Sequence, residues 1–303
     1  MGITDGFLNL LKPPGMTSHD VVAVVRRQLG AKRVGHLGTL DPAAAGVLPI
    51  SLGRATRLFQ HAAGPDKAYR AEVVFGVTTD TLDAEGRITA QTDASRLTAQ
   101  AVSRTLPRFL GEISQRPPAY SAVHVGGVRL HELARRGAPA PAPERRVRIS
   151  DLELVSFQSS EPPAALLDVV CSPGTYIRSL AADLGQALGC GAYLGFLVRT
   201  RAGRFELSEA VTLEELSAAD EAGELGGCLL APDWPLSHLP AVTLEARHER
   251  VFLHGGRVLT QSQPEALARV YGSARRFLGL GEVVSGGQLR PTLVLASVES
   301  EQR

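Results

Sequence analysis

The segment that most constrains this chain is residues 35–49, GHLGTLDPAAAGVLP, which combines three glycines and two prolines with a single carboxylate. Glycine permits backbone angles that other residues avoid and lets another group approach the backbone closely. Pro42 fixes its own φ and pushes Asp41 toward an extended conformation. We therefore predict a stiff loop that presents the Asp41 carboxylate from a largely apolar setting. By itself, such an aspartate is typical of a turn or a helix cap.

The length and composition are those of an ordinary globular protein. The 303 residues are enough for two domains of about 100 to 200 residues each. The hydrophobic fraction of 44% suits a sizeable core, and no apolar run reaches the roughly 18 residues that a membrane span needs. The first residues include neither a basic region nor a long apolar region, so no secretion signal is predicted.

The three cysteines, Cys171, Cys190 and Cys228, are far apart and show no Cys-x-x-Cys spacing. This pattern argues against a disulfide framework and against a structural zinc site, and it is typical of a reducing cytoplasm. We expect small buried hydrophobic side chains at these positions.

The net charge of +1 is unevenly distributed. Residues 8–70 hold nine Lys or Arg and three Asp or Glu, a net charge of +6, and residues 116–148 hold seven Arg and two Glu, a net charge of +5. Residues 214–303 hold eight Arg and twelve Asp or Glu, a net charge of −4. Two basic stretches in a near-neutral chain indicate a localised surface for a polyanion. The excess of arginine suits phosphate contacts, but a GC-rich genome would produce it too.

The hydrophobic pattern predicts an alternation of helices and strands. Thr17 with Asp20 forms a capping box for the first helix, and Thr212 with Glu215 forms one for the last. Helices are predicted at residues 17–29, 54–63, 98–110, 175–188 and 212–224, strands at 7–11, 67–75, 145–157, 165–171 and 196–201, and a strand or short helix at 46–53.

Two regions depart from this pattern. Residues 114–148 are basic, with a hairpin predicted to turn at residues 126–127 and a short helix at 130–136, as in an arm inserted into the main fold. Three prolines within residues 232–240 predict a domain boundary. The alternating Val and Leu stretches beyond it predict a small β domain of about 60 residues.

Several common catalytic motifs are absent. The sequence contains no phosphate-binding G-x-x-x-x-G-K-[ST], no Rossmann fingerprint, no G-x-S-x-G and no HExxH. The acidic segment 78–86 carries Asp80, Asp83 and Glu85, but their spacing does not match a calcium loop. Nucleotide hydrolysis, serine-dependent hydrolysis and metal hydrolysis are therefore unsupported.

What remains is one carboxylate, with aromatic and cationic residues in other segments. Tyr69 lies at the start of a predicted strand, and Tyr176 and Arg178 lie at a strand-to-helix turn. An arginine favours the ionised form of an aspartate beside it, and an aromatic ring stacks on a flat substrate. The set suits covalent or acid–base catalysis by a single carboxylate. Together with the basic stretches, it points to a nucleobase flipped out of an RNA.

Three segments resemble the signature motifs of the TruB-type tRNA pseudouridine synthases: residues 35–50, the KAYR of residues 67–70 and the GTYIR of residues 174–178. Their order and spacing also fit, as do the KPPGMTS of residues 12–18 and the GCGA of residues 189–192. The resemblance covers about residues 7–235, and several motifs in the right order make it specific.

The resemblance implies that uridine 55, in the T-loop of tRNA, is isomerised to pseudouridine without a cofactor or metal. Asp41 matches the catalytic aspartate, which either attacks the flipped uridine or assists its detachment from the ribose. Arg178 is expected to pair with Asp41. Tyr69 is expected to stack on the base and to help remove the C5 proton. The loop glycines are expected to leave room for the nucleotide backbone.

The remaining site residues follow from the same resemblance. Tyr176 and Leu197 are expected to line the pocket, and His36 to occupy the place that the flipped base vacates or to stack beside it. The sequence departs from the family at Ala43–Gly46, where bacterial members often have a larger residue and a Thr before the Gly, a change expected to affect packing and not chemistry.

The expected fold is α+β, with a mixed, mainly antiparallel sheet flanked by helices. Residues 1–235 are expected to form the catalytic domain, with a basic RNA-binding insertion at about 114–148. Residues 240–303 are expected to form a PUA-like RNA-binding β barrel, although the acidic balance of residues 214–303 fits strong phosphate binding poorly. The expected partner is the T-arm of tRNA, for a cytoplasmic monomer with no membrane and no obligatory protein partner.

Two alternatives stay open. The first is the archaeal and eukaryotic guide-RNA-dependent relative, which works with small partner proteins; the basic insertion, which resembles the arm of the stand-alone bacterial enzymes, argues against it. The second is a non-catalytic RNA-binding or RNA-folding chaperone, against which the intact set of Asp41, Tyr69 and Arg178 argues. Catalysis and chaperone activity can also coexist in one protein.

Overall fold

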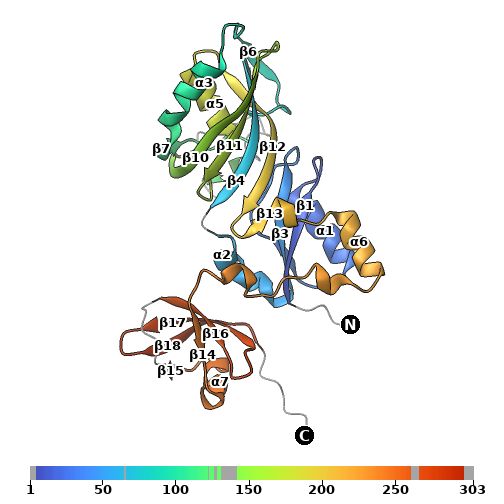
Figure 1. Ribbon diagram of the computed structural model, residues 1–303, viewed down its shortest axis with the longest axis vertical. Coiled ribbons are helices and arrows are strands. Elements are labelled where there is room, and N and C mark those ends of the chain that lie inside the picture. The colour runs from blue at the N-terminus through green and yellow to red at the C-terminus, as the bar shows by residue number, and fades with distance from the viewer. Residues whose placement is uncertain are drawn as a thin grey trace.

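The structure, a computed structural model, describes residues 5–64, 66–121, 123–125, 128–130, 142–260 and 266–296. A large sheet with helices packed against it is followed by a smaller sheet near the C-terminus (Figure 1). Among the described strands of the large sheet, only β3 and β12 pair in parallel, and the other pairs are antiparallel. The predicted α+β class with a mainly antiparallel sheet is therefore confirmed.

Nine described strands form the large sheet, in the order β1-β3-β12-β4-β11-β10-β7, with β2 on β3 and β13 on β12. They are β1 (Gly6–Lys12), β2 (Val34–His36), β3 (Ala45–Leu52), β4 (Lys67–Phe75), β7 (Gly111–Gln115), β10 (Arg145–Gln158), β11 (Ala164–Cys171), β12 (Ala192–Ala202) and β13 (Phe205–Glu206).

The alternation along β4 explains why one face of the sheet is covered. Tyr69, Ala71, Val73 and Phe75 point to the same side and are buried, because successive side chains of a strand face opposite ways. They share a core cluster with residues of β11, β12 and the helix α5 (Ile177–Ala187). This packing brings the start of α5 close to the start of β4.

The other helices follow the predictions, with two local changes. Both capping boxes are present, at the starts of α1 (Ser18–Gln28) and α6 (Leu213–Glu221). Residues 54–63 form a 3₁₀ helix (Gly53–Leu58) followed by α2 (Phe59–Ala62). The helix predicted at 98–110 is α3 (Ala99–Thr105), which tightens into a 3₁₀ turn (Leu106–Phe109) at Pro107, where the backbone has no N–H to donate. Within the described residues, no helix is long and apolar enough to cross a membrane.

The basic region at 114–148 leaves the large sheet after β7 and returns to it with β10, and these two strands pair. Between them, β8 (His124–Val125) pairs with β9 (Val128–Arg129). The turn expected at residues 126–127 and residues 131–136 of the expected helix lie outside the described residues. The acidic segment 78–86 joins an unpredicted hairpin of β5 (Val77–Thr79) and β6 (Ile88–Gln91).

The C-terminal residues form the small β domain that the pattern predicted, and a helix that it did not predict, α7 (Ala246–Leu253). The sheet order is β14-β16-β17-β18-β15. The strands are β14 (Ala241–Thr243), β15 (Val258–Leu259), β16 (Leu267–Tyr271), β17 (Phe277–Val284) and β18 (Gln288–Val294). Leu280 and Leu295 join Phe7 and Phe205 in one core cluster, so this domain packs directly on the larger one.

Gly46 provides a test of how closely β3 and β12 pack against each other. It has φ +110°, and a Cβ there would lie 2.3 Å from the carbonyl oxygen of Arg199 on the neighbouring strand β12. We predict that Gly46→Ala lowers the free energy of unfolding by about 3 kcal/mol, from backbone strain and overlap together. Gly223, with φ +74° and no atom within 4 Å of its Cβ position, is the matched control. Gly223→Ala should cost only about 1 kcal/mol in urea unfolding followed by circular dichroism, and equal losses would contradict the prediction.

Candidate active site

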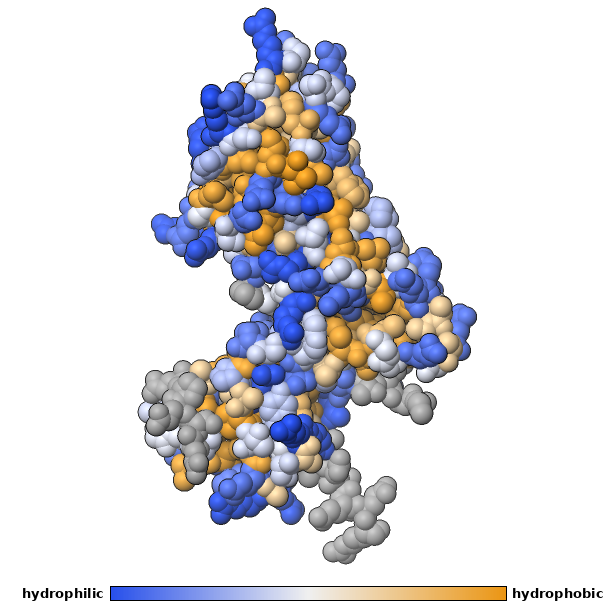
Figure 2. All heavy atoms as spheres, viewed as in Figure 1, coloured by the Kyte–Doolittle hydropathy of each residue, from blue (hydrophilic) through white to orange (hydrophobic). Residues whose placement is uncertain are grey.

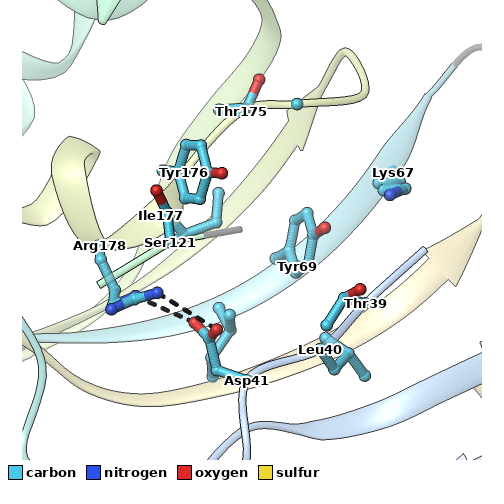
Figure 3. A pocket seen from close by; sticks show the side chains of 12 residues that line it. Thr39, Leu40, Asp41, Lys67, Tyr69, Ser121, Thr175, Tyr176, Ile177 and Arg178 are labelled. Atoms are coloured by element: carbon cyan, nitrogen blue, oxygen red, sulfur yellow. Dashed lines mark hydrogen bonds and ion pairs between the residues drawn. The ribbon is translucent and has the colours of Figure 1, made fainter. Parts of the chain in front are cut away.

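A cavity of about 250 Å³ lies where residues 39–41 meet the start of β4 and the start of α5 (Figure 3). Asp41, Tyr69, Tyr176 and Arg178 line it, and Leu197 of β12 contributes an apolar side chain. Segments more than a hundred residues apart in the sequence thus form one concave site, which is the usual form of a small-ligand site.

Arg178 contacts both oxygens of the Asp41 carboxylate (Figure 3). Its Nη2 donates a hydrogen bond to Oδ1 at 3.2 Å, and its Nε lies 3.0 Å from Oδ2. The arginine side chain is 6% exposed, whereas the Asp41 side chain is 42% exposed. The cation is therefore buried, and the carboxylate that it holds remains open to the cavity.

Arg178 has further partners on other segments. Its Nη1 donates to the carbonyl oxygen of Thr81 at 3.2 Å and lies 3.3 Å from Oδ2 of Asp83. Its Nη2 also donates to the carbonyl oxygen of Tyr120 at 2.9 Å. A buried guanidinium is tolerated only with such partners. Asp83, which is 14% exposed, anchors the far side of the arginine, so Arg178 lies between two carboxylates.

The residues on either side of Asp41 are fixed by the first strand and helix. Ser18 Oγ accepts a hydrogen bond from the backbone N–H of Leu40 at 2.9 Å and donates to its carbonyl oxygen at 3.2 Å. Lys12 Nζ donates to the carbonyl oxygen of Pro42 at 3.0 Å. Burial lowers the pKa of Lys12 to about 8, although the nearby charge of Asp41 opposes this shift.

Arg199 of β12 supports the same loop through its guanidinium. It is fully buried, and it donates to the carbonyl oxygens of Val47 (2.7 Å), Gly38 (3.0 Å) and Thr39 (3.3 Å). Burial lowers the pKa of Arg199, and its interaction with the phenol of Tyr69 opposes the shift. One side chain thus connects the loop of Asp41 to the aromatic ring in the cavity.

On the side where a Cβ would project, the loop glycines face the protein's own atoms, and the expected room for a nucleotide backbone stays a prediction. A Cβ at Gly38 would lie 2.7 Å from Nζ of Lys67, and one at Gly46 would overlap the Arg199 backbone. Gly35 faces the Ser51 hydroxyl at 3.2 Å. These glycines allow the protein's own strands and cations to pack tightly against the loop.

Tyr69 lines the cavity and is 7% exposed. Burial raises the pKa of its phenol, so the hydroxyl is protonated near neutral pH. The side chain can therefore stack and hydrogen-bond, but a phenolate base is disfavoured.

Tyr176 is fixed through its backbone and its ring. Its N–H donates to Oε1 of the buried Gln115 at 2.7 Å, and Nε2 of Gln115 donates to its carbonyl oxygen at 3.0 Å. The Arg145 guanidinium lies 5.0 Å from the centre of the Tyr176 ring, within cation–π distance. Because Arg145 begins β10, this contact joins the cavity wall to the base of the basic arm.

His36 is the one predicted site residue that is not among the residues lining the cavity. It ends β2, and its ring packs edge-on against His19, with 5.2 Å between the ring centroids. Burial lowers the pKa of His36, which favours the neutral imidazole.

Several residues that hold the site together are distant from one another in the sequence, and the sequence pattern does not indicate them. The sequence pattern indicates Asp83 only as a candidate metal ligand and Arg199 only as part of a strand. The described residues contain no group of three His, Cys, Asp or Glu that could hold a metal ion. A buried position for arginine within an alternating strand was the available signal for Arg199. The sequence offered no comparable signal for Ser18 or Gln115.

The two carboxylates beside Arg178 should contribute differently to stability. We predict that Asp83→Asn lowers the free energy of unfolding by about 2 kcal/mol, because it removes a buried charge that compensates the guanidinium. Asp41→Asn should change it by less than about 1 kcal/mol, because that carboxylate is much more exposed. Urea unfolding of the two variants provides the comparison, and a larger loss for Asp41→Asn would contradict it.

Three family models match successive segments of the chain. The N-terminal domain of the TruB family pseudouridylate synthases matches residues 26–177. The C-terminal domain of tRNA pseudouridylate synthase B matches residues 178–236, and the C-terminal model of pseudouridine synthase II TruB matches residues 240–295.

Curated relatives agree with these matches. The tRNA pseudouridine synthase B of Symbiobacterium thermophilum is 56% identical over 83% of this chain and 82% of its own length. The protein of the same name from Acaryochloris marina is 46% identical over 96% of this chain and 98% of its own.

Solved structures show the same fold. A Cbf5-Nop10-Gar1 complex contains a chain with a TM-score of 0.74 and 27% identity, covering 96% of this chain and 85% of that one. An H/ACA RNP bound to a substrate RNA containing 2′-deoxyuridine gives a TM-score of 0.73 and 25% identity with the same coverage. On its sequence, its fold and its family matches, this chain belongs to the TruB family of pseudouridylate synthases.

Proposed function

We propose that this chain converts uridine to pseudouridine in tRNA, and that its target is uridine 55 in the T-loop. The observation that carries the proposal is the Asp41 carboxylate, held by Arg178 at the edge of a cavity that Tyr69 also lines. The substrate follows from relatives named tRNA pseudouridine synthase B that are 56% and 46% identical to the chain.

The reaction needs no external reagent. The C1′–N1 bond of the uridine breaks and a C1′–C5 bond forms, while C5 loses a proton and N1 gains one. Atoms and electrons balance within the nucleotide, so the protein has to position the base, stabilise charge and move one proton. A single ionised carboxylate in a cavity suits this chemistry.

Asp41 acts on the flipped nucleotide, either as a nucleophile or by assisting detachment of the base from the ribose. Arg178 contacts and fixes both oxygens of the carboxylate, so the direction of approach is set before the substrate enters. Asp83 and the backbone carbonyl groups of Thr81 and Tyr120 hold the guanidinium in place when the substrate binds.

The cavity walls receive the uracil. Tyr69 stacks on the base with a neutral phenol, so any help that it gives in removing the C5 proton is as a hydrogen-bonding group and not as a phenolate. Tyr176 and Leu197 complete the apolar lining. His36 lies outside the cavity, where a neutral ring can fill the space that the base leaves in the RNA.

The domains divide the RNA contacts. Residues 1–235 form the catalytic unit, and the basic insertion near 114–148 holds the T-arm against the cavity. Residues 240–303 act as a PUA-like domain that makes a weaker contact with the tRNA. We propose that the enzyme acts as a cytoplasmic monomer without a protein partner, unlike the Cbf5 found in complexes with Nop10 and Gar1.

Asp41→Asn tests the catalytic role. We predict that pseudouridine formation in a T-arm stem-loop falls at least about a thousandfold, while the affinity for tRNA changes by less than about threefold. Asp168→Asn is the matched control, because it breaks an exposed Asp–Arg pair with Arg70, in which Nη2 lies 2.7 Å from Oδ2. Retained turnover in Asp41→Asn would exclude the proposed mechanism.

The stand-alone mode has its own test. The purified chain, incubated alone with an unmodified tRNA transcript, should form pseudouridine at position 55. Activity that appears only when a guide RNA and partner proteins are added would instead favour the guide-dependent mode.

A further inference from the structure

Lys67 lines the cavity and has no role in the mechanism derived so far. It is the first residue of β4 and precedes Tyr69 by two positions, so both side chains project from the same face of the strand (Figure 3). The chain has only three lysines, Lys12, Lys32 and Lys67.

The Lys67 ammonium has no hydrogen bond or ion pair within the described residues. Lys12, which is fully buried, donates to three backbone carbonyl oxygens at 2.6–3.0 Å. Burial lowers the pKa of Lys67 to about 8, and the charge of Arg199 lowers it further in the same direction. A half-buried cation without a partner is costly unless a ligand supplies one.

A second cation lies beside it. A Cβ at Gly38 would lie 2.7 Å from Lys67 Nζ and 3.7 Å from Arg199 Nη1, so the two positive groups flank the same backbone position. The contacts of Arg199 among the described residues are with backbone carbonyl groups and the Tyr69 phenol, and none is with a carboxylate. The nearby Cys171 thiol is neutral, because burial raises its pKa to about 11.

This wall of the cavity is therefore positive and uncompensated, whereas the wall at Arg178 is compensated by two carboxylates. We propose that Lys67, with Arg199 behind it, forms an anion subsite that receives a phosphate flanking the nucleotide in the cavity. This rests on the proposed function, because an RNA substrate is what brings a phosphate to this cavity.

A phosphate fits the site better than a uracil carbonyl oxygen does. The phosphodiester groups are the only anionic groups that a uridine in RNA carries, and charge-assisted hydrogen bonds are about twice as strong as neutral ones. A phosphate contact carries no base information, but it fixes the register of the backbone. Lys67 would thus set how far the nucleotide enters, and so where its C1′ lies relative to Asp41.

The test uses three T-arm stem-loops: one unmodified, and two in which a neutral methylphosphonate replaces the phosphate on the 5′ or the 3′ side of the target uridine. Dissociation constants and single-turnover rates are measured for wild type, Lys67→Met, Lys67→Arg and Lys32→Met. Lys32 is an exposed lysine and controls for general attraction to RNA.

We expect Lys67→Met to bind the unmodified stem-loop about 10- to 100-fold more weakly than wild type, with most of the loss recovered in Lys67→Arg. One of the two methylphosphonates should weaken wild type similarly and should add nothing to the loss in Lys67→Met. Lys32→Met should show the same small loss on all three RNAs.

Two outcomes would overturn the subsite. Losses from Lys67→Met and from both methylphosphonates that simply multiply would show that Lys67 contacts neither phosphate. A fall in rate with unchanged affinity on every RNA would assign Lys67 to the base instead. Failure of wild type to modify the unmodified stem-loop would count against the proposed function, and the binding data would still report on the subsite.

A spectroscopic readout is independent of activity. In protein labelled with ¹³C at lysine Cε, two of the three resonances should titrate near pH 8, those of Lys12 and Lys67. Binding of the unmodified stem-loop should move the Lys67 titration to higher pH, because a phosphate favours the ammonium form. The stem-loop with the critical methylphosphonate should leave the titration near pH 8, and a shift equal to that of unmodified RNA would contradict the proposal.

Discussion

The structure of the site depends on one buried cation, Arg178. Its guanidinium contacts Asp41, Asp83 and the backbone carbonyl groups of Thr81 and Tyr120. Because a buried arginine without partners is strongly disfavoured, these segments must fold together around it. The arrangement also explains the unequal exposure of the two carboxylates, since one serves as a fixed anchor and the other stays available to a substrate.

Two further cations and a serine make the loop around Asp41 stiff. Arg199 and Lys12 satisfy backbone carbonyl oxygens on both sides of Asp41, and Ser18 satisfies both backbone groups of Leu40. Glycine is needed at position 46 because β12 passes too closely for a Cβ. The rigidity therefore comes from tertiary hydrogen bonds and close packing, and the intrinsic preferences of Gly and Pro only make it possible.

The charges around the cavity are arranged asymmetrically. The wall at Arg178 is neutralised inside the protein, whereas the wall at Lys67 and Arg199 has no carboxylate in contact with it among the described residues. Figure 2 shows hydrophilic side chains interleaved with apolar ones over the visible face. The C-terminal domain is joined to the larger one by apolar packing through Leu280 and Leu295.

The sequence by itself determined the order of most elements, because alternation at Tyr69 to Phe75 and the capping boxes at Thr17 and Thr212 are local signals. Through its resemblance to a known family it also singled out Asp41, Tyr69, Tyr176 and Arg178, since each lies in a motif with a fixed sequence, and Leu197. The tertiary structure decided which side chains meet: Asp83 with Arg178, Gln115 with Tyr176, and Lys67 with Arg199 across Gly38. These contacts join segments separated by tens to more than a hundred residues, and no periodicity within a segment encodes them. Burial makes Tyr69 a neutral phenol, and the tertiary structure places His36 outside the residues that line the cavity.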